Sequence, residues 1–380
     1  MFVPDLRRLR PLGLAALCLG LLGTAGCAAS DGPVRIGLAG PFDDPVGRPM
    51  KLAAELAVEE INRAGGINGR MIELLAQNDH NNTDSAVAVA ERLRATDVSA
   101  VIGHLFSGTT LQAAPIYNGG SNPVVQLSPS SSSPEVSYAG PWTFRVCPSD
   151  LDHGRALASW VRDGLHYERG TVFYLNDQYG RGIRQTFVEE FRKRGGAVLA
   201  VNPYLGDVPE VGPYVERLAR DGRSQFMLVA GNLSEGQQVL REARARGVQL
   251  PIMGGDGLEG LEGTGAIAEG SYESAAYLPT IETPANRRFV EAWHAKYPAA
   301  GQPNQPAAAT YDAVYLLADV IRSAGTGRRA VREALASRDA AHPFEGVTGR
   351  IAFDSLGDVP SRTIYIAVVK NGALHLAGER

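Results

Sequence analysis

The sequence predicts an α/β protein built as two doubly wound parallel-sheet lobes, with a chain that crosses between them more than once. Short apolar runs alternate with segments of helical periodicity, a pattern typical of parallel sheets that helices cover on both faces. The alternation breaks at the serine-rich segment 128–133 and then starts again, which indicates a second lobe. A chain of 380 residues is also too long for one compact core.

The elements of the first lobe follow one another in regular order. A buried strand is expected at 34–39, and a helix rich in Ala, Leu and Glu at 50–64, which Gly65 and Gly66 end. The same alternation then predicts strands at 71–76, 98–103 and 123–127, and helices at 84–95 and 109–117.

A second series of the same kind predicts the second lobe. Its strands are expected at 171–175, 197–201, 226–230 and 251–253, and its helices at 154–162, 184–194, 213–220 and 235–246. The tail predicts helices at 285–297, 310–323 and 329–336, and strands at 349–353 and 363–369. These strands are too few for a third domain, so we expect the tail to complete both lobes. Repeated crossings make a hinge, where a ligand would bind.

The first residues are typical of a targeting segment. A positively charged stretch, with Arg7, Arg8 and Arg10, precedes an apolar segment at 11–23 that is too short to span a bilayer comfortably. Residues 1–26 are therefore predicted to be a signal peptide of an exported protein. No later segment is long and apolar enough to cross a membrane.

Small residues lead from this segment directly into Cys27. The arrangement resembles a bacterial lipobox, in which the cysteine is lipidated, although Thr24 stands where a branched apolar residue is usual. We expect lipidation at Cys27, a short tether over 27–33, and a protein held at a bacterial membrane, facing the periplasm or the exterior. An ordinary signal peptide cut at a nearby small residue is the alternative. A lipidated Cys27 would leave Cys147 without an intrachain disulfide partner.

Composition and motifs argue against several functions. The net charge of −4 provides no basic field for nucleic acid. Gly-x-Ser-x-Gly, phosphate-loop and His-Glu-x-x-His motifs are absent, and the seven histidines are dispersed, so no enzyme activity, metal site or cofactor is expected. Segment 255–260 matches Gly-x-Gly-x-x-Gly, but Asp256 and Glu259 would repel a pyrophosphate.

Five motifs in order carry a resemblance to a known family. They are VIGHLFSG (101–108), LSPSSSS (127–133), FRVCPSD (144–150), NDQYG (176–180) and FDSLGD (353–358). Together they resemble the branched-chain amino-acid (leucine/isoleucine/valine-type) binding proteins of ABC importers, over residues 34 to about 372.

The resemblance implies the type I periplasmic-binding fold, with a three-crossover hinge near Ser149, Ala276 and Ser361. The first lobe would comprise 34–149 plus 277–361, and the second 150–276 plus 362–380. It also implies a monomer that binds an amino acid between the lobes and delivers it to an ABC permease and its ATPase. A ligand-sensing receptor of the same fold is the alternative, but a single lipid-type anchor favours transport.

By this resemblance, Ser107 and Ser132 would bind the ligand carboxylate, together with main-chain N–H groups around Ser130. The position of Ser107 between a strand and a helix suits an anion, because free N–H groups and the helix dipole favour negative charge there. The alternatives are a helix N-cap for Ser107 and a solvated loop serine for Ser132.

The resemblance assigns the ligand ammonium to Asp256, in the segment MGGDG (253–257), where a longer glutamate is frequent. Asp150 and Tyr179 fill positions that line the cleft, although Asp150 also suits a helix cap or a hinge hydrogen bond. Val46 and Asn232 stand where the family often has aromatic residues. This departure leaves room for a larger or more polar ligand than leucine. The alternative to an amino acid is a different ligand, such as an amide or a small carboxylate.

Overall fold

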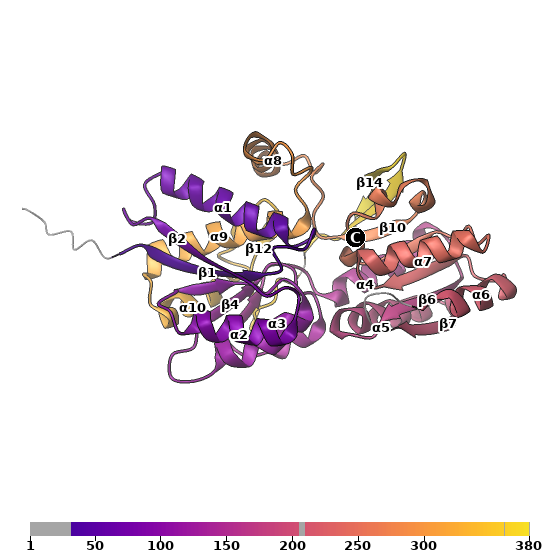
Figure 1. The fold of residues 1–380 in the computed structure, drawn as a ribbon, viewed down its shortest axis with the longest axis horizontal. Coiled ribbons are helices and arrows are strands. Elements are labelled where there is room, and N and C mark those ends of the chain that lie inside the picture. Colours follow the sequence, from indigo (N-terminus) through magenta and orange to yellow (C-terminus); the bar gives the residue numbers. More distant parts are fainter. Residues whose placement is uncertain (1–31, 205–209, 361, 380) are drawn as a thin grey trace, which may run out of the picture. The chain divides into compact units, whose positions relative to one another are not determined.

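We describe a computed structural model of the chain, in which residues 32–204, 210–360 and 362–379 are defined. Pro33–Arg380 form one compact unit (Figure 1). The predicted signal peptide, Cys27 and most of the predicted tether lie outside the described residues. Within the described ranges, no helix has the length and apolar character needed to cross a membrane.

The first sheet is wholly parallel and has the strand order β2-β1-β3-β4-β5. Its strands are β1 (Val34–Gly40), β2 (Ile72–Asn78), β3 (Ala100–Ile102), β4 (Val125–Ser128) and β5 (Thr143–Arg145). Its helices are α1 (Arg48–Arg63), α2 (Thr83–Arg94), α3 (Ser107–Asn118), α8 (Pro284–Lys296), α9 (Gln305–Ala324) and α10 (Arg328–Ala336). Helices α1 and α9 share one apolar core with the sheet, and α2 and α3 share another, so both faces are covered (Figure 1).

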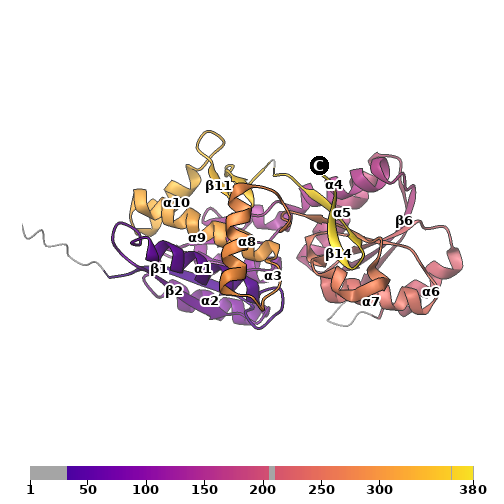
Figure 2. The same cartoon turned by 90° about the horizontal axis from the view of Figure 1, so that it is seen from above.

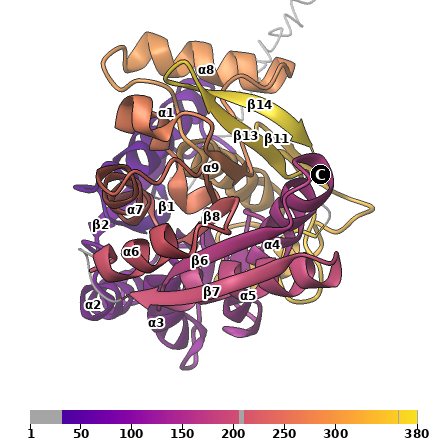
Figure 3. The same ribbon diagram turned by 90° about the vertical axis from the view of Figure 1, so that its right-hand side faces the viewer.

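The second sheet has the order β14-β13-β10-β9-β8-β6-β7. Its strands are β6 (Arg169–Leu175), β7 (Ala197–Tyr204), β8 (Phe226–Ala230), β9 (Ile252–Gly254), β10 (Tyr272–Ala275), β13 (Tyr365–Lys370) and β14 (Ala373–Glu379). Its helices are α4 (Asp150–Ser159), α5 (Gln178–Lys193), α6 (Gly212–Asp221) and α7 (Leu233–Ala245). The α4 and α5 side chains form one core with this sheet, and those of α6 and α7 form the other (Figure 3).

Short elements complete the fold. A π-helical turn (Trp160–Gly164) continues α4, and 3-10 turns lie at η1 (Pro134–Tyr138), η3 (Asp256–Leu258) and η4 (Leu261–Ala268). Strands β11 (Phe344–Gly346) and β12 (Gly349–Ile351) form a separate two-stranded sheet.

The chain passes between the two sheets three times. It leaves the first sheet after β5, returns after β10 to build α8 to α10, and enters the second sheet again at β13. The last strand, β14, is yellow in Figure 2. This confirms the predicted fold class of two doubly wound sheets with a three-crossover connection.

Several predicted elements need correction. Strands β5, β10, β11 and β14 were not expected, β13 and β14 are antiparallel additions to a parallel sheet, and 349–353 belongs to the separate hairpin. Helix α5 begins at Gln178 and not at 184, because Asp177 caps it. Gly180 there lies where a Cβ would be 2.1 Å from the carbonyl oxygen of Leu175, so a glycine in the first turn marks close packing and not a loop. Helix α9 likewise begins at Gln305 and not at 310, with Asn304 as its cap.

Arg328, at the start of α10, holds several segments of the first lobe together. Its buried guanidinium donates hydrogen bonds to four main-chain carbonyl groups, those of Val98 (2.9 Å), Asn122 (3.0 Å), Arg94 (3.1 Å) and Thr96 (2.6 Å). These carbonyls belong to the two segments that enter β3 and β4, so one side chain links both segments to the start of α10.

We predict that Arg328→Ala lowers the free energy of unfolding by about 2–4 kcal/mol, because it leaves buried carbonyl groups without donors. The exposed neighbour Arg329 provides the control, and Arg329→Ala should change stability by less than about 0.5 kcal/mol. Urea unfolding followed by circular dichroism measures both. Equal stability of the two variants would contradict the role of Arg328.

Candidate functional site

Ser107 is the first residue of α3, directly after the loop that follows β3. The N-cap position belongs to Phe106, so the alternative interpretation of Ser107 as the N-cap is wrong. Its Oγ instead accepts a hydrogen bond from the main-chain N–H of Ser133, at 3.2 Å, and the residue is only 4% exposed. The start of α3 and the serine-rich segment are therefore adjacent, as the resemblance implies.

Arg145 holds the serine-rich segment in place. The guanidinium of this buried arginine donates to the carbonyl oxygens of Ser132 and Ser133, each at 2.9 Å, and pairs with the Asp358 carboxylate at 2.7 Å. Ser132 is 1% exposed, so the alternative of a solvated loop serine is wrong. Because the carbonyl groups of the segment face Arg145, its conformation is fixed without any ligand.

A buried pair, His104 and Asp79, also supports the serine-rich segment. His104 Nδ1 lies 2.6 Å from Asp79 Oδ2, and both side chains are fully buried. The main-chain carbonyl of His104 accepts hydrogen bonds from the hydroxyls of Ser128 (2.8 Å) and Thr110 (3.1 Å). Asp79 could not be identified from the sequence, because the spacing of Asp79 and His104 does not link them before the fold is known.

Asp256 begins η3 just beyond the carboxyl end of β9, the central strand of the second sheet. Its Oδ1 accepts a hydrogen bond from the Tyr179 hydroxyl at 3.0 Å, and that hydroxyl accepts one from the N–H of Gly257 at 2.7 Å. Two of the predicted site residues are thus in direct contact. Burial and the neighbouring Asp256 raise the pKa of Tyr179, so the phenol is a stable hydrogen-bond donor.

Asp150 is the first residue of α4 and is fully buried. Ser149 is the N-cap of that helix, so the Asp150 carboxylate is not a cap. Its main-chain N–H donates to the carbonyl of Ser132 at 2.8 Å, which is the hinge hydrogen bond considered as the alternative. Neither carboxylate oxygen has a well-aligned hydrogen bond among the described residues, although the Ser132 side chain interacts with the group and lowers its pKa.

The electrostatic environment of Asp150 is unfavourable to a negative charge. Burial raises its pKa well above the usual value, and the Asp256 carboxylate raises it further, while Ser132 and Arg145 act in the opposite direction. His153, one turn along α4, places Nδ1 at 3.1 Å from Ser274 Oγ. Its Nε2 has no hydrogen-bond partner in the described structure and lies 3.7 Å from Asp256 Oδ2. Asp150 and His153 therefore both have unused hydrogen-bonding capacity close to Asp256.

The elements that carry the two halves of the site are in contact. A Cβ added to Gly108 in α3 would lie 3.5 Å from Gln178 Oε1 at the start of α5. A Cβ on Gly182 in α5 would lie 2.4 Å from Asp150 Oδ2 and 2.9 Å from Pro134, which follows the serine-rich segment. The geometry therefore brings the serines, Asp150, Tyr179 and Asp256 into one region.

The first residues of α9 contact two further predicted site residues, Val46 and Ser130. Asn304 Nδ2 donates to the carbonyl of Val46 at 3.2 Å, and Ser130 Oγ donates to Gln305 Oε1 at 3.1 Å. The main-chain N–H of Gln305 donates to Glu259 Oε1 at 2.8 Å. Gln305 and Glu259 were missed as site residues, although Asn304 followed by Pro306 is a sequence signal for a helix start.

Asn232 differs from the other predicted residues because it already has a structural role. It is the N-cap of α7, in a capping box with Glu235, and its main-chain N–H donates to Glu235 Oε2 at 2.9 Å. Its half-exposed side chain lies at the carboxyl end of β8, beyond Gly231.

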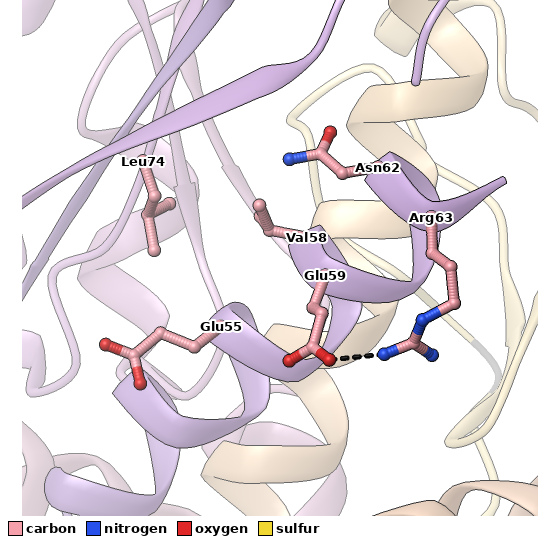
Figure 4. A pocket seen from close by; sticks show the side chains of 6 residues that line it. All are labelled: Glu55, Val58, Glu59, Asn62, Arg63 and Leu74. Carbon is pink, nitrogen blue, oxygen red and sulfur yellow. Dashed lines mark hydrogen bonds and ion pairs between the residues drawn. The ribbon is translucent and has the colours of Figure 1, made fainter. Parts of the chain in front are cut away.

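Two surface hollows lie elsewhere on the described structure. One, of about 460 Å³, lies between α1 and β2, where Glu59 is ion-paired with Arg63 (Figure 4). The other, of about 550 Å³, lies beside β5 and includes Tyr138 and Leu356. Neither hollow includes a predicted site residue, so neither is the predicted ligand site. No group of three or more His, Cys, Asp or Glu side chains in the described ranges is arranged to hold a metal ion.

Comparison with known proteins identifies relatives of the whole described chain. The chain is 31% identical over 356 residues to the leucine-, isoleucine-, valine-, threonine- and alanine-binding protein of Pseudomonas aeruginosa, covering 90% of this chain and 91% of the relative. A substrate-binding protein of an ABC transporter from Desulfitobacterium hafniense, solved in complex with leucine, is 29% identical with a TM-score of 0.78, covering 90% of this chain and 99% of that one.

A branched-chain amino-acid transporter substrate-binding protein from Streptococcus pneumoniae, solved with isoleucine, is 27% identical, with a TM-score of 0.81 and coverage of 92% and 99%. A family model described as "periplasmic binding protein" matches residues 33–373, which is nearly all of the described chain. With the two doubly wound sheets and the three crossings between them, these matches show that the chain belongs to the periplasmic binding protein family, in its branched-chain amino-acid-binding type.

Proposed function

We propose that the protein is an extracytoplasmic substrate-binding protein of an ABC importer, and that it binds an amino acid between lobes comprising 34–149 plus 277–361 and 150–276 plus 362–380. The single observation that carries the proposal is the approach of two chemically opposite groups. Serine hydroxyls and the N–H groups at the start of α3 suit a carboxylate, and Asp256 with Asp150 suits an ammonium group. An α-amino acid carries both charges on one carbon atom.

In this proposal, Ser107 and Ser132 with the N–H groups near Ser130 bind the ligand carboxylate. Asp256, held by Tyr179, binds the ammonium group, and Val46 and Asn232 line the side-chain end. A ligand that contacts elements of both sheets stabilises the arrangement in which they are adjacent, and it does so only by its additional contacts there. The names of the relatives, which bind leucine, isoleucine and other amino acids, support this substrate class.

Transport requires a position outside the cytoplasmic membrane and a partner. We propose that residues 1–26 direct export, that Cys27 carries the lipid, and that the monomeric protein delivers its ligand to a permease with its ATPase. Mass spectrometry of the mature N-terminus tests the lipid, and an unmodified Cys27 would contradict it.

Asp256→Asn tests the ammonium site. After a thermal-shift screen of the common amino acids has identified the best ligand, we expect the variant to lose about 2–5 kcal/mol of binding free energy, since a buried ammonium would lose its counter-charge. Calorimetric titration measures the loss. Asp84→Asn, an exposed acidic residue in the first turn of α2, should bind like the parent protein. Unchanged affinity in Asp256→Asn would refute the assignment.

Asp150→Asn separates a binding role from a structural one. Because burial raises the native pKa of Asp150, the charged carboxylate destabilises the fold as pH rises above its ordinary value of about 4. We predict that the ligand-free variant is more stable by about 1–3 kcal/mol at pH 7, and that this gain disappears near pH 4. Ligand affinity should fall in the same variant.

The control for this experiment is Asp152→Asn, which removes a partly exposed carboxylate from the same helix turn and should change neither quantity. Urea unfolding at the two pH values and calorimetric titration provide the measurements. A destabilised Asp150→Asn protein with normal affinity would show that the carboxylate is structural.

A further inference from the structure

His153 is a buried polar side chain close to Asp256 that the proposed function does not use. It lies in the first turn of α4, just after the first crossing between the sheets, and its side chain is fully buried. Its Nδ1 lies 3.1 Å from Ser274 Oγ in β10, and its Nε2 lies 3.7 Å from Asp256 Oδ2 at the start of η3. His153 therefore links α4 to the carboxylate that is proposed to bind the ligand ammonium group.

The approach of His153 to Asp256 leaves hydrogen-bonding capacity unused. Hydrogen bonds between nitrogen and oxygen span about 2.7–3.2 Å, so 3.7 Å is too long for a direct bond. Nε2 has no hydrogen-bond partner among the described residues, and a buried ring nitrogen in this state is costly. The Tyr179 hydroxyl already donates to Asp256 Oδ1, so Oδ2 is the oxygen that faces the ring. The two facing atoms lack a shared donor.

An ammonium nitrogen can supply that donor. It carries three N–H groups, and a nitrogen about 2.9 Å from each of two acceptors bridges a separation of 3.7 Å. With its proton on Nδ1, His153 donates to Ser274 Oγ, and the unprotonated Nε2 is then an acceptor. A hydrogen bond at one ring nitrogen commonly sets the role of the other, so Ser274 favours the tautomer that suits a cation at Nε2.

We infer that His153 is a further ligand-binding residue, whose neutral imidazole accepts a hydrogen bond at Nε2 from the ligand ammonium group while Asp256 Oδ2 accepts another. This inference rests on the proposed function and adds a pH-regulated contact to its ammonium site. Imidazole is the side chain that ordinarily changes charge between pH 5 and 8. An imidazolium has no acceptor, and it would compete with the ligand as the cationic partner of Asp256. Acidification should therefore release the ligand.

Other titratable groups near Asp256 contribute to its environment. Those that interact with Asp256 or with its neighbours are Asp150 on α4, Tyr179 on α5, Glu273 in β10, and Arg145 and Cys147 before α4. Burial raises the pKa of Tyr179 and of Cys147, so both stay neutral below pH 8, and Arg145 is paired with Asp358. Burial also raises the pKa of Asp150 and of Glu273, so their protonation adds to any pH dependence. A substitution at His153 leaves all these groups in place, and its difference from the parent protein isolates the imidazole.

Two substitutions of His153 test the contact by calorimetric titration at pH 8 and pH 5.5, with L-leucine or, if L-leucine does not bind, the tightest of the other neutral L-amino acids. We expect the affinity of the parent protein to fall about tenfold or more on acidification. His153→Gln keeps an acceptor that does not titrate, so its affinity at pH 8 should stay within about threefold of the parent, and its fall on acidification should be at least about threefold smaller. His153→Leu removes the acceptor and should weaken binding about tenfold or more at pH 8.

The exposed His375 in β14 provides the matched control, and His375→Gln should keep both the parent affinity and its pH dependence. A His153→Gln protein with the full pH dependence of the parent, or a His153→Leu protein with the parent affinity at pH 8, would overturn the inference and leave the proposed function standing. If no neutral L-amino acid binds the parent protein at pH 8, the proposed function fails and the inference fails with it.

A measurement on the parent protein requires neither variant to fold. In protein labelled with ¹⁵N in its histidine side chains, nuclear magnetic resonance distinguishes protonated from unprotonated ring nitrogens. We expect the bound amino acid to shift an unprotonated ring-nitrogen resonance at pH 8, because Nε2 of His153 gains an N–H donor. Ring-nitrogen resonances that are the same with and without the bound amino acid would contradict the contact.

Discussion

The organisation of the site depends on buried carboxyl groups that the described protein leaves without a cationic partner. Among the described residues, the Asp150 carboxyl group forms no ion pair and one Glu273 oxygen has no hydrogen-bond partner, and the neighbouring Asp256 raises the pKa of both groups. Protein interiors rarely tolerate such groups unless they serve a function, because an unpaired buried charge costs several kcal/mol. A ligand cation would turn this cost into binding free energy.

The fold explains how these groups come together. Ser107, Tyr179 and Asp256 all lie just beyond the carboxyl ends of parallel strands, which are β3, β6 and β9. Side chains in such positions gather at one edge of a doubly wound sheet, where ligands usually bind. Because the chain crosses between the sheets three times, the edge of one sheet is tied to that of the other through Asp150 and Gln305. Asp150, at the first crossing, is therefore also a predicted site residue.

Much of the fold could be predicted from the sequence, because strands such as 226–230 are continuous apolar runs and helices such as α1 have strong periodicity. Strand β10 escaped prediction because Glu273 and Ser274 interrupt its apolar pattern. The start of α5 escaped because Gly180 and Gly182 imitate a loop, although close packing against Leu175 and Asp150 explains both glycines.

The site, like the fold, could be predicted from the sequence only in part. The motifs pointed to Ser107, Ser132, Tyr179 and Asp256, and the structure brings these residues into one region. From the sequence, Glu259 is expected only to repel a pyrophosphate, and no role is expected for Glu273. The proximity of Glu273 to Asp256 depends on the packing of η3 against β10, which no local sequence pattern specifies.

Proton exchange on binding is the most direct test of the central claim that uncompensated carboxylates bind the ligand cation. Burial raises the pKa of Asp150, and a ligand ammonium group beside its carboxyl group would lower that pKa again and so release a proton. Titration calorimetry in buffers of different ionisation enthalpy measures this exchange. The account predicts that binding of the best amino-acid ligand releases protons. Binding enthalpies that do not depend on the buffer would contradict it.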